Sequence, residues 1–230
     1  LFMKHCLHMN EILDKHTAIM DKYDPEKRVA LVVDEWGSWY DVEEGTNPGF
    51  AYQQNTMRDA MIAGVTLNIF NSRVDRIKMA NLAQAVNVLQ AAILTKGEKM
   101  LLTPTYHVMK MYAAHQDAQL LPLSFESPNY TFNGESLPAI SASASKKDGA
   151  VNISLVNIDS EKENEVELDL SALGIKELSG TILTSEKIQD HNTFDKPDKI
   201  KTKEFEKFSF RKGKLTMAIP PFSVIMLEGK

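Results

Sequence analysis

The chain has 230 residues, 43% hydrophobic and 25% charged, which is enough to bury one large core or two modest ones. Its net charge is −5 and it has no dense run of Lys or Arg, so we expect no nucleic acid as a partner. No apolar stretch approaches the roughly 18 residues that cross a bilayer, so we expect no membrane as a partner either. Its single cysteine, Cys6, excludes an intrachain disulfide framework and a multi-cysteine zinc site, and leaves the compartment open.

Residues 1–116 follow the alternating pattern of an α/β fold. Their apolar spacing predicts helices over 2–23, 54–70 and 103–115 and strands over 28–33 and 76–81. Pro25 ends the first helix, while Thr103 as N-cap and Pro104 at the first helical position open the last. The uninterrupted apolar run of 28–33 is typical of a parallel strand buried on both faces. The order helix, strand, helix, strand, helix is that of repeated βα units.

Residues 117–230 change to short segments with two-residue alternation, separated by turns that contain glycine. We expect strands near 119–125, 139–145, 150–157, 164–170, 179–184, 204–210, 214–219 and 222–228. The side chains expected on the inward face of the terminal hairpin are Phe208, Phe210, Leu215, Met217 and Ile219. This part is therefore predicted to be an antiparallel β-sandwich, which makes the whole chain α/β plus all-β.

Two acids stand at the end of the first predicted strand. In βα folds, the carboxyl ends of the strands are where functional sites are built. Because side chains alternate along a strand, Leu31, Val33 and Glu35 are expected on one face. Val32 and Asp34 are expected on the other, so only one of the two acids would point toward a barrel axis.

Aromatic side chains follow these acids at once, at Trp36, Trp39 and Tyr40. Aromatic faces beside a carboxylate suit a sugar, whose C–H faces pack on rings while its hydroxyls need hydrogen bonds. The alternative is structural, with an acid that caps a helix and aromatics that fill the mouth of a barrel.

A second group, on the first predicted helix, could be read as a metal site. His5, Cys6, His8 and Glu11 crowd this helix, and His8 lies one turn from Glu11. We interpret the group as a helix surface with one apolar cysteine, because no fixed partner ligand is evident elsewhere. His107 and His115, on the last helix, are likewise interpreted as surface or packing residues.

Several blocks of sequence carry a family resemblance. Residues 32–40 read Val-Val-Asp-Glu-Trp-Gly-Ser-Trp-Tyr, and further blocks lie at 55–60, 75–87 and 103–108. Together they resemble the α-L-arabinofuranosidases of glycoside hydrolase family 51, whose nucleophile segment reads Asp-Glu-Trp, two variable residues, then Trp-Tyr. The resemblance covers most of 29–145 and weakens through the predicted sandwich.

This resemblance implies a (β/α)8 TIM barrel followed by a C-terminal β-sandwich. Residues 1–116 would be the C-terminal portion of the barrel, with its last two βα units, and residues 117–230 the sandwich. A complete barrel takes about 250 residues, so the first six strands are expected in a missing N-terminal portion of the same protein. Open sheet edges seek partners, and we therefore also expect a homo-oligomer.

The resemblance also implies retaining hydrolysis of terminal α-L-arabinofuranosyl groups in arabinan- or arabinoxylan-type glycans. Glu35 would be the nucleophile, Trp39 would lie at the sugar subsite and Gln84 would hydrogen-bond the arabinose. No metal and no cofactor are expected, because two carboxyl groups complete this chemistry. The second, the acid/base Glu, is expected in the missing portion, so the 230 residues alone should be inactive. Gly37 departs from the family, in which an asparagine is common at this position.

Two alternatives remain open from the sequence. One is a related barrel glycosidase of another specificity, such as an endoglucanase. The other is a non-catalytic carbohydrate-binding or structural module, although the predicted sandwich has no tryptophan and few aromatics that could form a flat sugar platform.

Overall fold

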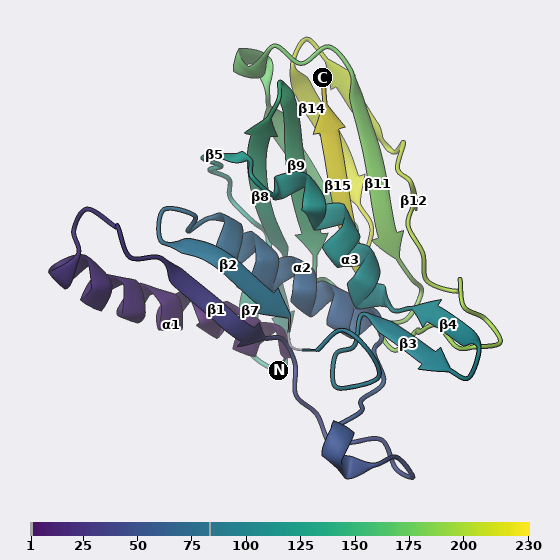
Figure 1. The fold of residues 1–230 in the computed structure, drawn as a ribbon. Helices are drawn as coiled ribbons and strands as arrows, with labels where there is room; N and C mark the ends of the chain where they lie inside the picture. The colour runs from purple at the N-terminus through teal and green to yellow at the C-terminus, as the bar shows by residue number, and fades with distance from the viewer. Residues whose placement is uncertain (1, 83) are drawn as a thin grey trace.

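The computed structural model describes residues 2–82 and 84–230 (Figure 1). Its helices are α1 (Phe2–Tyr23), α2 (Met57–Asn71) and α3 (Pro104–Tyr112), with single 3₁₀ turns η1 (Pro48–Phe50), η2 (Ala113–His115) and η3 (Ser171–Leu173). The helix expected over 2–23 is confirmed. The second helix begins at Met57 because the Thr56 hydroxyl accepts a hydrogen bond from the Arg58 amide as an N-cap. Thr103 and Pro104 open α3 as predicted.

The strands before residue 117 are β1 (Leu31–Trp36), β2 (Ile77–Leu82), β3 (Ile93–Lys96) and β4 (Lys99–Leu102). The later ones are β5 (Gln119–Leu121), β6 (Asn129–Phe132), β7 (Glu135–Pro138), β8 (Ile140–Lys147), β9 (Ala150–Asn157), β10 (Asn164–Asp169), β11 (Leu178–Thr184), β12 (Lys203–Glu204), β13 (Phe208–Arg211), β14 (Lys214–Ile219) and β15 (Ser223–Gly229). None of the described helices has the length and apolar composition of a membrane span.

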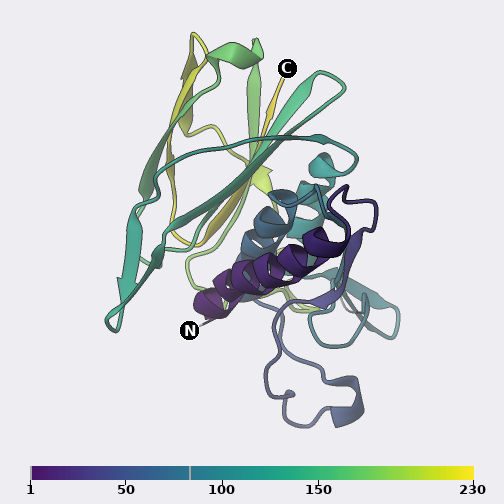
Figure 2. The same cartoon turned by 90° about the vertical axis from the view of Figure 1, so that its left-hand side faces the viewer.

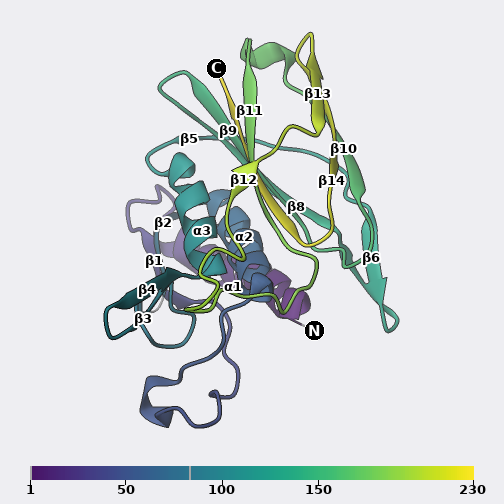
Figure 3. The same cartoon turned by 90° about the vertical axis from the view of Figure 1, so that its right-hand side faces the viewer.

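These elements form successive layers (Figure 3). A parallel pair, β1–β2, lies on one side of the three helices, and a six-stranded antiparallel sheet in the order β12-β11-β15-β9-β8-β5 lies on the other. A three-stranded sheet, β10-β14-β13, covers the far face of the six-stranded sheet. The antiparallel sandwich that the sequence predicts is therefore present, with the helices packed on its outside.

The central strands of the six-stranded sheet are buried on both faces. Ile153 and Leu155 of β9 belong to the sandwich core, which also takes in Leu215 and Met217 of the three-stranded sheet. Val156, the next residue of β9, belongs to the core formed with the helices. Because alternate side chains enter two different cores, no residue of β9 beyond its first is exposed to solvent.

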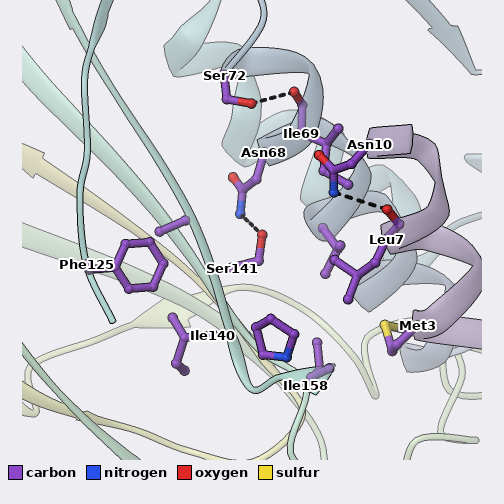
Figure 4. A pocket seen from close by; sticks show the side chains of 13 residues that line it. Met3, Leu7, Asn10, Asn68, Ile69, Ser72, Phe125, Ile140, Ser141 and Ile158 are labelled. Atoms are coloured by element: carbon purple, nitrogen blue, oxygen red, sulfur yellow. Dashed lines mark hydrogen bonds between the residues drawn. The ribbon is translucent and has the colours of Figure 1, made fainter. Parts of the chain in front are cut away.

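The helices meet the six-stranded sheet around a small apolar hollow of about 220 Å³ (Figure 4). Leu7 and Ile69 reach it from α1 and α2, while Ile140 reaches it from the start of β8. Across its edge the Asn68 amide donates to the Ser141 hydroxyl, at 3.1 Å between Nδ2 and Oγ. Polar and apolar contacts therefore both join the helices to the sandwich.

The parallel pair differs from the prediction in two ways. Between Val33 and Trp36, three residue steps of β1 oppose two of β2, so the register contains a bulge. As a result Trp36 turns to the helix side together with Leu31 and Val33, and strict alternation is wrong at this point. Both acids, Asp34 and Glu35, are exposed.

The expected burial of the strand on both faces is also wrong for the described residues. Val32 of β1 is 41% exposed and Met79 of β2 is 55% exposed, because nothing in the described chain covers this face. The pair has two strands only, so no closed barrel lies within residues 2–82 and 84–230.

A buried arginine holds β1 beside the end of α1. Arg76 is 1% exposed, and its Nη1 donates to Asp24 Oδ2 and to the Val29 carbonyl, each at 2.8 Å. Its Nη2 donates to the Asp24 carbonyl and to Asp21. Hydrogen bonds from the Val29 amide and from Arg76 lower the pKa of Asp24 to about 2. The connection from α1 to β1 is thereby fixed, and with it the position of the strand that carries Glu35.

Two hairpins, β3–β4 and β6–β7, were not predicted. The second turns at Asn133-Gly134, where φ is +50° and +78°. An Asn-Gly pair is a strong hairpin signal, so the sequence contained the information that would have found it.

Candidate active site

Glu35, Trp39 and Gln84 line a single hollow of about 430 Å³ at the carboxyl ends of β1 and β2. Glu35 lies one residue before the end of β1, and Gln84 follows β2 by two residues. The other residues that line this hollow are Trp36, Gly37, Ser38, Gly49, Phe50, Ala51, Leu89 and Gln90. The structure therefore brings together the three side chains that the sequence singled out, although they come from separate segments.

The two acids at the end of β1 have different surroundings. Asp34 Oδ1 accepts a hydrogen bond from Asn81 Nδ2 of the neighbouring strand, at 3.4 Å. Glu35 lines the hollow and, among the described residues, is the only acid that does so. The bulge in β1 gives Glu35 this placement.

Trp39 is the exposed aromatic of the site, with 75% of its surface accessible. The loop that follows it, residues 41–51, extends away from the body of the molecule (Figure 2). The short turn η1 within this loop is capped by Asn47, whose side chain accepts a hydrogen bond from the Gly49 amide. Phe50, at the end of η1, returns to line the hollow. An open aromatic surface thus faces the same space as Glu35.

Gly37 makes the sharp turn between Glu35 and Trp39. Its φ is +123°, a conformation that residues with a side chain rarely adopt, and a Cβ there would overlap the Gln90 side chain. The Gln90 amide donates to the Ser38 carbonyl. A side chain at position 37, such as the asparagine common in the family, would strain this φ and would require the Gln90 side chain to move. Sequence reasoning did not identify Gln90, because no periodicity or motif marks it.

The polar group on α1 is arranged as a helix surface. His8 Nδ1 lies 3.0 Å from Glu11 Oε2, and both side chains are exposed. Cys6 is half-buried, and burial raises the pKa of its thiol to about 11. Within the described residues, no three His, Cys, Asp or Glu side chains are grouped as metal ligands.

The two histidines of the α3 region are held within the fold. Burial lowers the pKa of His107, which is a buried residue of α3. His115 lies between Ser145 and Ser154, and burial lowers its pKa to about 4. Neither histidine lines the hollow around Glu35.

Comparison with known proteins places this arrangement in a family. Residues 34–223, which include Glu35, Trp39 and Gln84, match the family described as "Alpha-L-arabinofuranosidase C-terminal domain". The chain belongs to this family. The matched range begins at Asp34, in β1, and includes most of the sandwich. It therefore spans both the α/β part and the all-β part of the chain.

Individual relatives agree with this assignment. The chain is 46% identical over 228 residues to an intracellular exo-α-L-arabinofuranosidase of Bacteroides ovatus, which covers 98% of this chain and 44% of the relative. It superposes on the family 51 arabinofuranosidase of Xanthomonas axonopodis pv. citri with a TM-score of 0.97 and 45% identity, over 99% of this chain and 46% of that one. The chain thus corresponds to the C-terminal part of family 51 α-L-arabinofuranosidases and spans less than half the length of these relatives.

More distant structures share the fold. A family 51 α-L-arabinofuranosidase of Bifidobacterium longum, 22% identical, has a TM-score of 0.83 over 98% of this chain and 47% of that protein. The layered arrangement of strand pair, helices and sandwich is therefore kept at low sequence identity.

Proposed function

We propose that the protein containing this chain is an α-L-arabinofuranosidase that removes terminal, non-reducing α-L-arabinofuranosyl groups with retention of configuration. The observation that supports it is the convergence of Glu35, Trp39 and Gln84 on one hollow, in a chain that belongs to this family. The substrates would be arabinan- or arabinoxylan-type glycans and their oligosaccharides.

Glu35 is the proposed nucleophile. Its carboxylate attacks the anomeric carbon, the bond from that carbon to the leaving oxygen breaks, and a glycosyl-enzyme ester forms. A second carboxylic acid protonates the leaving oxygen and then takes a proton from the water that hydrolyses the ester. In a retaining enzyme the carboxyl group of this acid lies about 5–5.5 Å from that of the nucleophile. Since Glu35 is the only acid lining the hollow in the described residues, we assign the second acid to a portion of the protein outside this chain.

Trp39 and Gln84 are proposed to hold the sugar. The exposed ring of Trp39 offers an apolar face for the C–H groups of a furanose, and the amide of Gln84 can both donate and accept hydrogen bonds to its hydroxyls. Trp39 follows the end of β1 and Gln84 follows the end of β2, and because both line the hollow, both can contact one ring.

The remaining barrel is proposed to cover the exposed face of β1–β2. Under this proposal residues 1–116 are the last two βα units of a (β/α)8 barrel and residues 117–230 form the sandwich domain. Val32 and Met79 are exposed apolar residues on the face that missing strands would cover. An N-terminal barrel portion of the same protein is the expected partner, and further copies of the protein would form a homo-oligomer.

The decisive experiment uses the longest natural chain that contains these residues, assayed on an aryl α-L-arabinofuranoside. Glu35→Gln is nearly isosteric but cannot attack the anomeric carbon, so turnover should fall by several orders of magnitude. The neighbouring Asp34→Asn is the matched control and should keep more than a tenth of the wild-type kcat. Equal losses in the two variants would contradict the assignment of Glu35.

A second assay identifies the reaction step. Glu35→Gly removes the nucleophile and leaves space for azide, which should restore turnover and give an arabinofuranosyl azide of inverted configuration.

Residues 1–230 alone should release no arabinose from arabino-oligosaccharide, because no acid is present to protonate a poor leaving group. Release of arabinose by that fragment would show that the acid/base lies within the chain.

Assays of the full-length protein on other glycans distinguish the two alternatives, a glycosidase of another specificity and a non-catalytic module. Hydrolysis of cellulose in preference to the arabinofuranoside would favour an endoglucanase. Binding of arabinan without hydrolysis by the full-length protein would favour a carbohydrate-binding module.

A further inference from the structure

The two carboxylate oxygens of Asp59, a residue of the first turn of α2, have different partners. Asp59 is 5% exposed. Its Oδ2 accepts hydrogen bonds from the Thr56 amide at 2.8 Å and from Arg58 Nη2 at 3.2 Å. Its Oδ1 accepts a hydrogen bond from the Ser38 hydroxyl, also at 2.8 Å. The first set closes the α2 capping box, whereas the second crosses to the segment that follows Glu35.

The capping function does not explain the contact with Ser38. A capping box is complete when the N-cap residue and the third helical residue exchange hydrogen bonds, and Thr56 and Asp59 do this without Oδ1. A buried carboxylate with an unused oxygen would be unfavourable, and Ser38 satisfies that oxygen. Hydrogen bonds to an ionised carboxylate are stronger than neutral ones, so this contact holds the Ser38 segment firmly.

Both neighbours of Trp39 are attached to the start of α2 or to the segment just before it. Ser38 is bound by Asp59, and the Tyr40 amide donates to Gln53 Oε1 at 2.8 Å. The Arg58 guanidinium also lies 3.6 Å from the centre of the Tyr40 ring. Trp39, between them, is exposed. The segment is thus fixed on each side of Trp39, whose exposed side chain lines the hollow.

We propose that Asp59 is a positioning residue, which sets the orientation of Trp39 toward the sugar through its hydrogen bond with Ser38. This inference rests on the proposed function, because it takes Trp39 as the residue that packs on the arabinofuranosyl ring. Asp59 itself does not line the hollow that contains Glu35. A displacement of the ring by about 1 Å weakens stacking and misaligns the anomeric carbon with Glu35, which is enough to lower the rate measurably.

The experiment separates the two oxygens of Asp59 in the full-length protein. Ser38→Ala removes the donor to Oδ1 and leaves the capping box intact. Thr56→Ala, the matched control, removes the hydroxyl that caps α2 and lies 3.3 Å from Oδ2, and leaves Ser38 in place. Ser38→Thr keeps a hydroxyl and is the rescue variant. Each variant is measured for kcat and KM on arabino-oligosaccharide, for its unfolding temperature and for amide hydrogen exchange of residues 37–41.

If Asp59 positions Trp39, Ser38→Ala should lower kcat/KM about tenfold, chiefly through KM, and should also lower the unfolding temperature, because Oδ1 of the buried carboxylate loses its donor. Ser38→Thr should recover wild-type values within about twofold. Thr56→Ala should lower the unfolding temperature and leave kcat/KM within twofold of wild type. Exchange at 37–41 should increase in Ser38→Ala and not in Thr56→Ala.

Two results would overturn the proposal. One is unchanged kinetics in Ser38→Ala, and the other is an equal loss of activity in Ser38→Ala and Thr56→Ala. A protein without arabinofuranosidase activity would contradict the proposed function instead. In that event the exchange experiment still decides whether Asp59 holds the segment, because it requires no substrate, and unchanged exchange at 37–41 in Ser38→Ala would overturn the positioning role.

Discussion

Asn68 of α2 accepts a hydrogen bond from Ser154 of β9, with 2.7 Å between Oδ1 and Oγ. The same oxygen accepts from Tyr112 of α3 at 2.9 Å and from Ser143 of β8 at 3.0 Å. One buried amide thus joins two helices to two strands of the sandwich. Because these elements come from both halves of the chain, the position of the βα part relative to the sandwich depends on a polar contact as well as on apolar packing.

Removal of this amide should destabilise the protein. Asn68→Ala leaves three buried hydroxyls without a shared acceptor, and we expect a loss of about 2–3 kcal/mol in the free energy of unfolding. Urea unfolding of the variant and wild type measures the difference. Asn71→Ala, which removes a single half-buried hydrogen bond to Ser143, is the control and should cost less than about 1 kcal/mol. Similar losses of unfolding free energy in the two variants would show that the shared hydrogen bonds of Asn68 contribute no more than a single one.

The neighbouring His115 should make stability depend on pH. Burial lowers its pKa from 6.5 to about 4, so the unfolded chain binds a proton more readily than the folded one between these values. Stability is therefore fully present above pH 6.5 and falls as the pH drops toward 4, by up to about 1.4 kcal/mol for each pH unit. His115→Gln removes this titration. Unfolding measured between pH 7 and 4.5 should have a shallower slope in the variant, with a residual contribution from His107, whose pKa is also lowered. An identical slope would contradict the assignment.

A side chain at Gly37 should be destabilising. Gly37→Ala combines a positive φ with an overlap against Gln90, so we expect about 1–3 kcal/mol of destabilisation and a loss of arabinofuranosidase activity of tenfold or more. Gly134→Ala is a matched control, because Gly134 also has a positive φ but faces open space. It should lose stability through backbone strain alone and keep its activity. Equal activity in the two alanine variants would contradict a role for the Gly37 turn.

Trp39 should contribute to substrate binding. Trp39→Ala removes the exposed ring beside Glu35, and we expect KM to rise about tenfold and kcat to fall, since the ring holds the sugar in position for attack. Trp39→Phe should recover part of the loss. The control is Phe132→Ala, which removes another exposed aromatic residue from β6, a strand that lies across the molecule from the 41–51 loop (Figure 3). Kinetics on arabino-oligosaccharide test the three variants, and unchanged values for Trp39→Ala would assign this residue a structural role.

Local features of the chain could be predicted from the sequence because they depend on near neighbours. The helix over 2–23, the N-cap at Thr103 and the alternating strands of the sandwich follow from side-chain periodicity and capping. The Asp-Glu pair at the end of an apolar run likewise marks the carboxyl end of a strand, which is why Asp34 and Glu35 could be named as candidates, and the family resemblance then selected Glu35. The aromatic run after these acids marked Trp39 as a candidate for packing on a sugar, whereas only the family resemblance identified Gln84, which no local pattern distinguishes.

Only the tertiary structure decided which of these residues meet. The bulge that exposes both Asp34 and Glu35 arises from the register between β1 and β2, and register is a property of two strands that are distant in the chain. In the same way, Ser38 meets Asp59 and Gly37 meets Gln90 only when the helices and loops pack together. The sequence by itself determined the chemistry available and the elements that carry it, because propensity and periodicity act over a few residues. The site was decided by packing, because its contacts join positions that are tens of residues apart.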